Sequence, residues 1–160
     1  MALLKEEDRK TLINEFKDLE NPIDLVMFSQ DLECQYCKET RMIGEEVAEL
    51  SDKINFKVYD FVKDKTVAKA YNVDKIPAIA VTKGGDTPKD YGIRHFGIPS
   101  GYEFSTLVED IKMIGHGESG LSAETKAQVA DLKDPLHLQV FVTPTCPYCP
   151  PAVFLAHQLA

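Results

Sequence analysis

The sequence has no tryptophan, no cysteine outside two closely spaced pairs, and fewer basic than acidic residues. It also lacks any stretch near the roughly 20 apolar residues that cross a bilayer. Its N-terminus is charged from Lys5, too early for a secretory signal. The 26 acidic and 18 basic side chains give a formal net charge of -8, which repels nucleic acid and anionic membranes. We therefore expect a cytoplasmic protein with no nucleic-acid and no membrane partners.

What is present is the composition of an ordinary globular protein, with 44% hydrophobic and 28% charged residues in 160. All four cysteines lie in two Cys-x-x-Cys pairs, Cys34-Gln35-Tyr36-Cys37 and Cys146-Pro147-Tyr148-Cys149. In a reducing compartment such pairs are usually catalytic or metal-binding, because structural disulfides do not persist there. The question of function is thereby narrowed to two chemistries.

The first 116 residues predict one complete α/β unit. Its last helix has Ser100 and Glu103 at capping-box spacing, and Gly84-Gly85-Asp86 supplies the turn of a hairpin. Hydrophobic periodicity indicates, in chain order, a helix over 5–19, a strand over 23–28, a helix from 37 to about 50, a strand over 54–59, a helix over 66–71, strands over 78–81 and 91–96, and a helix over 100–114.

The remaining residues, 117–160, predict only the beginning of a second unit: a helix over 123–132 capped by Ser122, a strand over 136–142, and a helix after the second cysteine pair. The glycine-rich stretch 115–120 is the expected boundary. Both halves repeat the order of amphipathic helix, Asn-Pro or Asp-Pro, apolar strand and Cys-x-Tyr-Cys. The wide spacing of the two copies suggests duplication of a whole small domain.

A cysteine pair between a strand and a helix suits thiol-disulfide exchange. The thiolate is the attacking species, and the N-terminus of a helix lowers the thiol pKa by stabilising negative charge. Two intervening residues bring a second thiol close enough to resolve the mixed disulfide formed by the first. We expect Cys34 and Cys146 to be the nucleophiles, and Cys37 and Cys149 the resolving thiols.

The alternative is a metal-binding module that holds zinc or an iron-sulfur cluster through the cysteine pairs. Zinc ribbons separate their pairs by roughly 15 to 20 residues, far less than the separation here, and place them on short knuckles. The four histidines, His95, His116, His137 and His157, are scattered without metal-ligand spacing and are expected to be surface or packing residues. Gly115-x-Gly117-x-x-Gly120 follows a helix and reads as a linker. We expect no cofactor and no metal.

The motifs resemble those of the thioredoxin and glutaredoxin superfamily. The residues that carry the resemblance are the first cysteine pair followed by Lys75-Ile76-Pro77-Ala78, and the run Phe141-Val142-Thr143-Pro144-Thr145 before the second pair. The tandem arrangement looks like the glutaredoxin-like protein disulfide oxidoreductases of thermophilic archaea and bacteria. The resemblance implies a three-layer α/β thioredoxin-like fold, complete in 1–116 and begun in 117–160.

The same resemblance assigns roles to residues. Cys34, Cys37, Cys146 and Cys149 would be catalytic, and Ile76-Pro77 would be a cis peptide that leaves the backbone of Ile76 free to bind an extended substrate. From the sequence by itself a trans bond is favoured, because only about 5% of such bonds are cis. The implied partners are protein disulfide or dithiol substrates and an upstream reductant, either thioredoxin-reductase-like or another thiol.

Overall fold

The computed structural model describes residues 3–143 and 145–160. Four strands form one mixed sheet in the order β2-β1-β3-β4. β1 runs parallel to β2 and antiparallel to β3, and β4 pairs antiparallel with β3. The elements are α1 (Glu6–Glu15), β1 (Ile23–Ser29), α2 (Cys37–Ala48), β2 (Ile54–Asp60), α3 (Lys65–Ala70), β3 (Ala78–Lys83), β4 (Arg94–Phe96), α4 (Tyr102–His116), α5 (Ala123–Ala130) and α6 (Cys149–Gln158).

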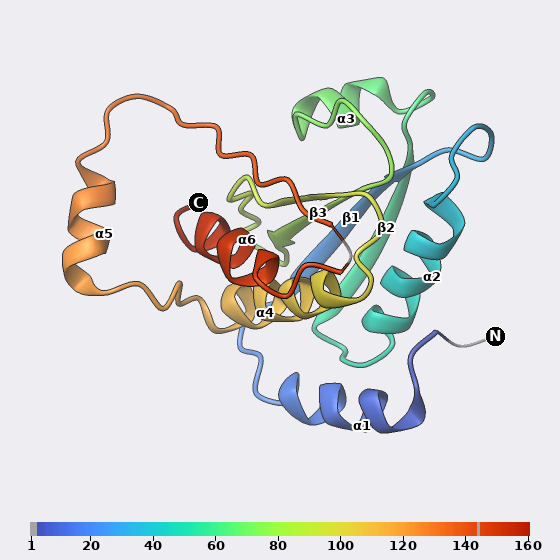
Figure 1. Cartoon of the computed structure of the whole chain (residues 1–160), viewed down its shortest axis with the longest axis horizontal. Helices are drawn as coiled ribbons and strands as arrows, with labels where there is room; N and C mark the ends of the chain where they lie inside the picture. Colours follow the sequence, from blue (N-terminus) through green and yellow to red (C-terminus); the bar gives the residue numbers. More distant parts are fainter. Residues whose placement is uncertain (1–2, 144) are drawn as a thin grey trace.

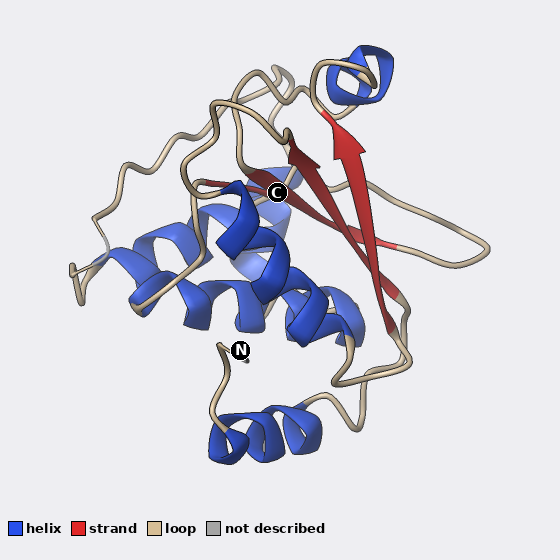
Figure 2. Cartoon of the chain, turned by 90° about the vertical axis from the view of Figure 1, so that its right-hand side faces the viewer, coloured by secondary structure: helices blue, strands red, loops and turns tan. Residues whose placement is uncertain are grey.

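Helices cover both faces of the sheet, which explains why β1 is an unbroken apolar run. Leu25 and Met27 belong to the larger core, together with buried residues of α1, α2 and α4. Val26 and Phe28 point the opposite way, into a smaller core with Ala68 of α3. Figure 2 shows most of the helices gathered on one side of the sheet. The predicted three-layer α/β architecture is confirmed.

The start of α4 differs from the prediction. The helix begins at Tyr102 with Gly101 as N-cap, and no side chain caps it. The capping box of Ser100 and Glu103 is therefore wrong. Glu103 is only 8% exposed, because its side chain faces the interior instead of reaching back to the helix start.

The end of α4 extends past the predicted residue, so Gly115 and His116 are helical rather than part of a linker. The Gly115 carbonyl accepts backbone N–H bonds from Glu20 and Asn21, at 3.0 and 2.9 Å. A side chain at Gly115 would overlap Leu19. Gly117 ends the helix with a φ of 73°, in the left-handed region that glycine adopts without strain.

The second part of the chain holds α5 and α6. Ser122 caps α5 as predicted, since its hydroxyl accepts the Thr125 N–H at 3.1 Å. The predicted strand over 136–142 is wrong: these residues form no strand, and Phe141 is 89% exposed. Within the described chain no strand lies beside this segment, so its backbone has no ladder to join. Figure 1 shows α5 standing away from the sheet, whereas α6 lies on α4.

None of the helices within residues 3–143 and 145–160 is both long and apolar enough to span a membrane.

Candidate active site

The first cysteine pair lies between the end of β1 and the start of α2. Cys37 is the first residue of α2 and is 4% exposed, whereas Cys34 is half-buried in the loop before it. The two form a disulfide with Cα atoms 5.5 Å apart. The outer thiol is therefore open to a substrate and the inner one is sheltered, which agrees with the predicted division between nucleophile and resolving residue.

The backbone at this helix start favours negative charge on sulfur. Tyr36 is the N-cap and its side chain makes no capping hydrogen bond, so it does not compete for the first N–H groups of the helix. Those N–H groups and the helix dipole stabilise a thiolate. Glu39, in the first turn, has the opposite electrostatic effect but is exposed to solvent, which screens it.

Pro77 lies at the same edge of the sheet as this pair. Phe28 near the end of β1 pairs in register with Ala78 at the start of β3, so the chain before β3 runs beside the loop that carries Cys34. The Ile76-Pro77 bond is cis, which confirms that expectation. Pro77 is buried and its carbonyl accepts the Gly97 N–H at 2.8 Å, while Ile76 is half-buried. Both Ile76 and Cys34 pack against the larger core.

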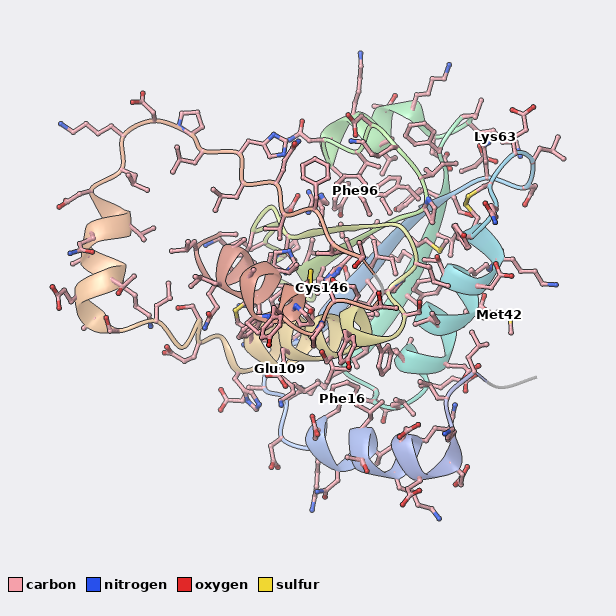
Figure 3. The ribbon with its side chains drawn as sticks, viewed as in Figure 1. Phe16, Met42, Lys63, Phe96, Glu109 and Cys146 are labelled. Carbon is pink, nitrogen blue, oxygen red and sulfur yellow. A yellow bond between two sulfur atoms is a disulfide. The ribbon has the colours of Figure 1, made fainter. Side chains whose placement is uncertain are left out.

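The second cysteine pair also forms a disulfide, with Cα atoms 5.5 Å apart, at the start of α6. Pro150 and Pro151 fall in the first helical turn, where backbone N–H groups have no partner to lose. Cys146 and Cys149 are both half-buried, and Tyr148 between them is 85% exposed. Figure 3 shows Cys146 beside α6, away from the start of α2. Among the described residues, the cis peptide at Pro77 has no counterpart near this pair.

Both pairs can therefore exchange two electrons by opening and closing a disulfide. A sulfur atom within a disulfide is not the thiolate that zinc and iron-sulfur clusters require. The arrangement favours dithiol chemistry over metal binding by the cysteines.

The structure also brings together residues that the sequence did not connect. His95 on β4, Asp110 on α4 and His157 on α6 meet in the interior. His95 Nε2 and His157 Nδ1 lie 2.7 and 2.8 Å from the same oxygen, Asp110 Oδ2. The interpretation of the histidines as scattered is thus wrong for His95 and His157. The available signal was Asp110, an acidic residue on the apolar face of a helix.

Electrostatics in this region differ between the two carboxyl groups. Burial by itself would raise the pKa of Asp110, but hydrogen bonds from His157 and His95 outweigh burial and hold that pKa below its usual range. Burial raises the pKa of Glu103, and the nearby charges of His95 and His157 offset this only in part.

Comparisons with known proteins agree with this geometry. A family model described as thioredoxin matches residues 5–95, more than half of the chain. A protein disulfide oxidoreductase from Aeropyrum pernix k1 is similar in structure, with a TM-score of 0.88 and 30% identity over 98% of this chain and 67% of that one. The NTD_N/C domain of alkylhydroperoxide reductase AhpF from Enterococcus faecalis (V583) has the same fold, with a TM-score of 0.84 and 24% identity over 98% of this chain and 73% of that one.

Among curated proteins, the alkyl hydroperoxide reductase component AhpF of Xanthomonas campestris pv. phaseoli is 30% identical over 109 residues, which cover 68% of this chain and 18% of that protein. The chain spans about a fifth of the length of such relatives. The match over residues 5–95 includes the sheet, the cysteine pair at the start of α2 and Pro77. This chain belongs to the thioredoxin family.

Proposed function

We propose that the chain is a thiol-disulfide oxidoreductase that works through dithiol exchange, with its leading site at Cys34 and Cys37. The observation that carries the proposal is the half-buried Cys34 joined to the buried Cys37 at the start of α2. In this proposal residues 1–116 form a complete thioredoxin-like unit, and residues 117–160 are the beginning of a second.

In the reducing direction, the Cys34 thiolate attacks one sulfur of a substrate disulfide and the other substrate sulfur leaves as a thiolate. The Cys37 thiolate then attacks Cys34 Sγ, which releases the second substrate thiol and closes the disulfide seen here. Two electrons pass to the substrate, and an upstream reductant restores the dithiol. Oxidation of a substrate dithiol is the reverse sequence.

Substrate binding falls to the backbone before β3. Ile76 lies next to the loop that carries Cys34, because β1 and β3 are paired in register. An extended peptide can add main-chain hydrogen bonds to such a segment. We assign Ile76 and Pro77 to this role, and Cys146 and Cys149 to a second dithiol site.

The partners are protein disulfides or dithiols and an upstream thioredoxin-reductase-like or other thiol reductant. Support comes from the relatives: one solved structure is named a protein disulfide oxidoreductase, and several curated proteins are named as components of an alkyl hydroperoxide reductase. A cytoplasmic setting is supported by the acidic composition and by cysteines confined to the two pairs.

Insulin reduction with dithiothreitol tests the proposal. The wild type should accelerate precipitation of the insulin B chain, and Cys34→Ser should lower the rate to that without protein, because the remaining Cys37 is buried. Cys146→Ser is the matched control at the other pair and should keep most of the activity. Full activity in Cys34→Ser, or none in the wild type, would contradict the assignment.

A further inference from the structure

The three side chains that meet between β4, α4 and α6 form a second cluster, here called the His95–Asp110–His157 cluster. One donor atom from each residue lies within 4.8 Å of the others. The side chains are 6%, 0% and 11% exposed in that order. The dithiol chemistry uses none of them, so the cluster needs a separate explanation.

Two carboxylate oxygens in this region lack hydrogen-bond partners among the described residues. They are Asp110 Oδ1 and Glu103 Oε1, both fully shielded from solvent. Glu103 lies two turns before Asp110 on the same face of α4, and the charges of His95 and His157 act on it. Buried acceptors without partners are costly, and a bound ion is one of the few features that accounts for them.

We propose that His95, Asp110 and His157 form a binding site for a divalent transition-metal ion, and that zinc is the ion that fits best. Two imidazole nitrogens and one carboxylate oxygen are a donor set that zinc accepts. Magnesium and calcium instead require sites built from oxygen. The ligands come from three separate elements, as they do in sites that stabilise a fold.

The geometry needs little adjustment to accept the ion. Zinc–nitrogen and zinc–oxygen bonds of about 2.0 to 2.2 Å place tetrahedral donor atoms about 3.3 Å apart. The imidazole nitrogens now lie 2.7 and 2.8 Å from Asp110 Oδ2, so each ring moves outward by about half an ångström. Asp110 Oδ1 or a water completes the coordination.

The unpaired oxygen of Glu103 also has a place in this site. His95 coordinates through Nε2 and His157 through Nδ1, so each neutral ring carries its proton on the other nitrogen. A histidine that binds metal usually donates that second N–H to a carboxylate or carbonyl. Glu103 Oε1 is a buried acceptor that lies near both rings and has no partner among the described residues. Glu103 is therefore a positioning residue, and the two carboxylates balance the charge of one dication.

Metal binding would hold the second part of the chain against the first. His157 is on α6, which also carries Cys149, whereas His95 and Asp110 belong to the first unit. An ion bound only by the folded arrangement stabilises it by mass action. The second cysteine pair would then be held in place by a metal that is not bound to sulfur.

The test uses the full chain, stripped of metal by a chelator, with both disulfides closed so that no thiol competes. Titration with Co²⁺ should give visible d–d absorption that saturates at one equivalent, without thiolate-to-cobalt charge transfer in the near ultraviolet. Zn²⁺ should displace the cobalt and raise the melting temperature. The absence of both the absorption and the rise in melting temperature would overturn the proposal, as would a spectrum with thiolate bands.

Variants locate the site. His157→Gln should weaken binding by tenfold or more, and Glu103→Gln by about tenfold, whereas the exposed His137→Gln should bind like the wild type. Equal affinity in His157→Gln and the wild type would contradict the assignment. If His157→Gln does not fold, cobalt-loaded wild type decides by NMR: two exchangeable, paramagnetically shifted imidazole N–H signals are required. Insulin reduction by metal-free protein should be unchanged, which separates this proposal from the proposed function.

Discussion

At the scale of single residues, Arg94 shows how one side chain joins three parts of the first unit. Its guanidinium donates to the Tyr71 carbonyl at 2.9 Å, to its neighbour the Ile93 carbonyl at 2.8 Å, and to both carboxylate oxygens of Asp90. It also stacks on the Tyr71 ring, 5.2 Å from the centroid. The two-pronged contact with Asp90 is the geometry in which arginine binds a carboxylate most strongly.

This contact predicts a pH-dependent effect of Asp90→Asn. Burial would raise the pKa of Asp90, but hydrogen bonds from Arg94 and the Gly92 N–H outweigh burial and lower that pKa. A lowered folded-state pKa contributes stability above the ordinary carboxyl pKa, and this contribution is lost as pH falls through the folded value. Asp90 is 36% exposed, so solvent screening limits the loss at neutral pH to about 1 kcal/mol.

Urea denaturation of wild type and Asp90→Asn between neutral and acid pH measures this effect. The stability difference should shrink towards zero at the acid end. The exposed Asp86→Asn is the control and should show no such trend. A difference that stays constant with pH would mean that the charge of Asp90 contributes nothing.

Predictability at this scale depended on how near in sequence the partners are. The four cysteines were found because two residues separate each pair, and that spacing has chemical meaning. His95, Asp110 and His157 come from three elements, and only the packing of α6 on α4 joins them. Sequence spacing therefore carries no sign of that cluster.

At the scale of elements, the periodic segments of the first unit were predicted well and the chain's later strand was not. β1, α2 and β3 form where apolar periodicity indicated them, because each has a neighbour to bury its apolar face. Residues 136–142 have the same strand-like composition but no paired strand within the described chain. Strand propensity depends on context, so composition without a neighbouring strand is not enough.

The contact between α2 and β2 predicts that Gly44→Ala destabilises the unit. A side chain at Gly44 would overlap the ring of Phe56, which packs against the larger core. Overpacking of about 1 to 3 kcal/mol exceeds the gain of about 1 kcal/mol in helix propensity. We expect a net loss of about 1 kcal/mol or more in the free energy of unfolding, measured by urea denaturation. Phe56→Leu in the same chain should recover part of it, and failure to do so would place the strain elsewhere.

At the scale of the whole molecule, a long exposed connection separates two well-packed parts. The sheet and its helices hold the buried cores, and α6 returns to α4 after the chain has passed through α5. The connection between α5 and α6 exposes several large apolar side chains, namely Leu132 (56%), Leu136 (66%), Leu138 (53%), Val140 (41%) and Phe141 (89%). The predicted boundary near residue 117 coincides with the end of α4, but the sequence did not predict that α6 packs back onto that helix.

Limited proteolysis with chymotrypsin should therefore cut first between Leu132 and Phe141. Proteases need several residues of unpaired, accessible backbone, and this connection supplies them, whereas Phe28 in β1 is 0% exposed and hydrogen-bonded on both sides. Mass spectrometry of early fragments should show the chain from its N-terminus to this connection as the first stable product. Tyr148, 85% exposed but next to the Cys146–Cys149 disulfide, is an internal comparison and should be cut more slowly. Early cuts within residues 23–96 would contradict the division into a compact unit and an exposed connection.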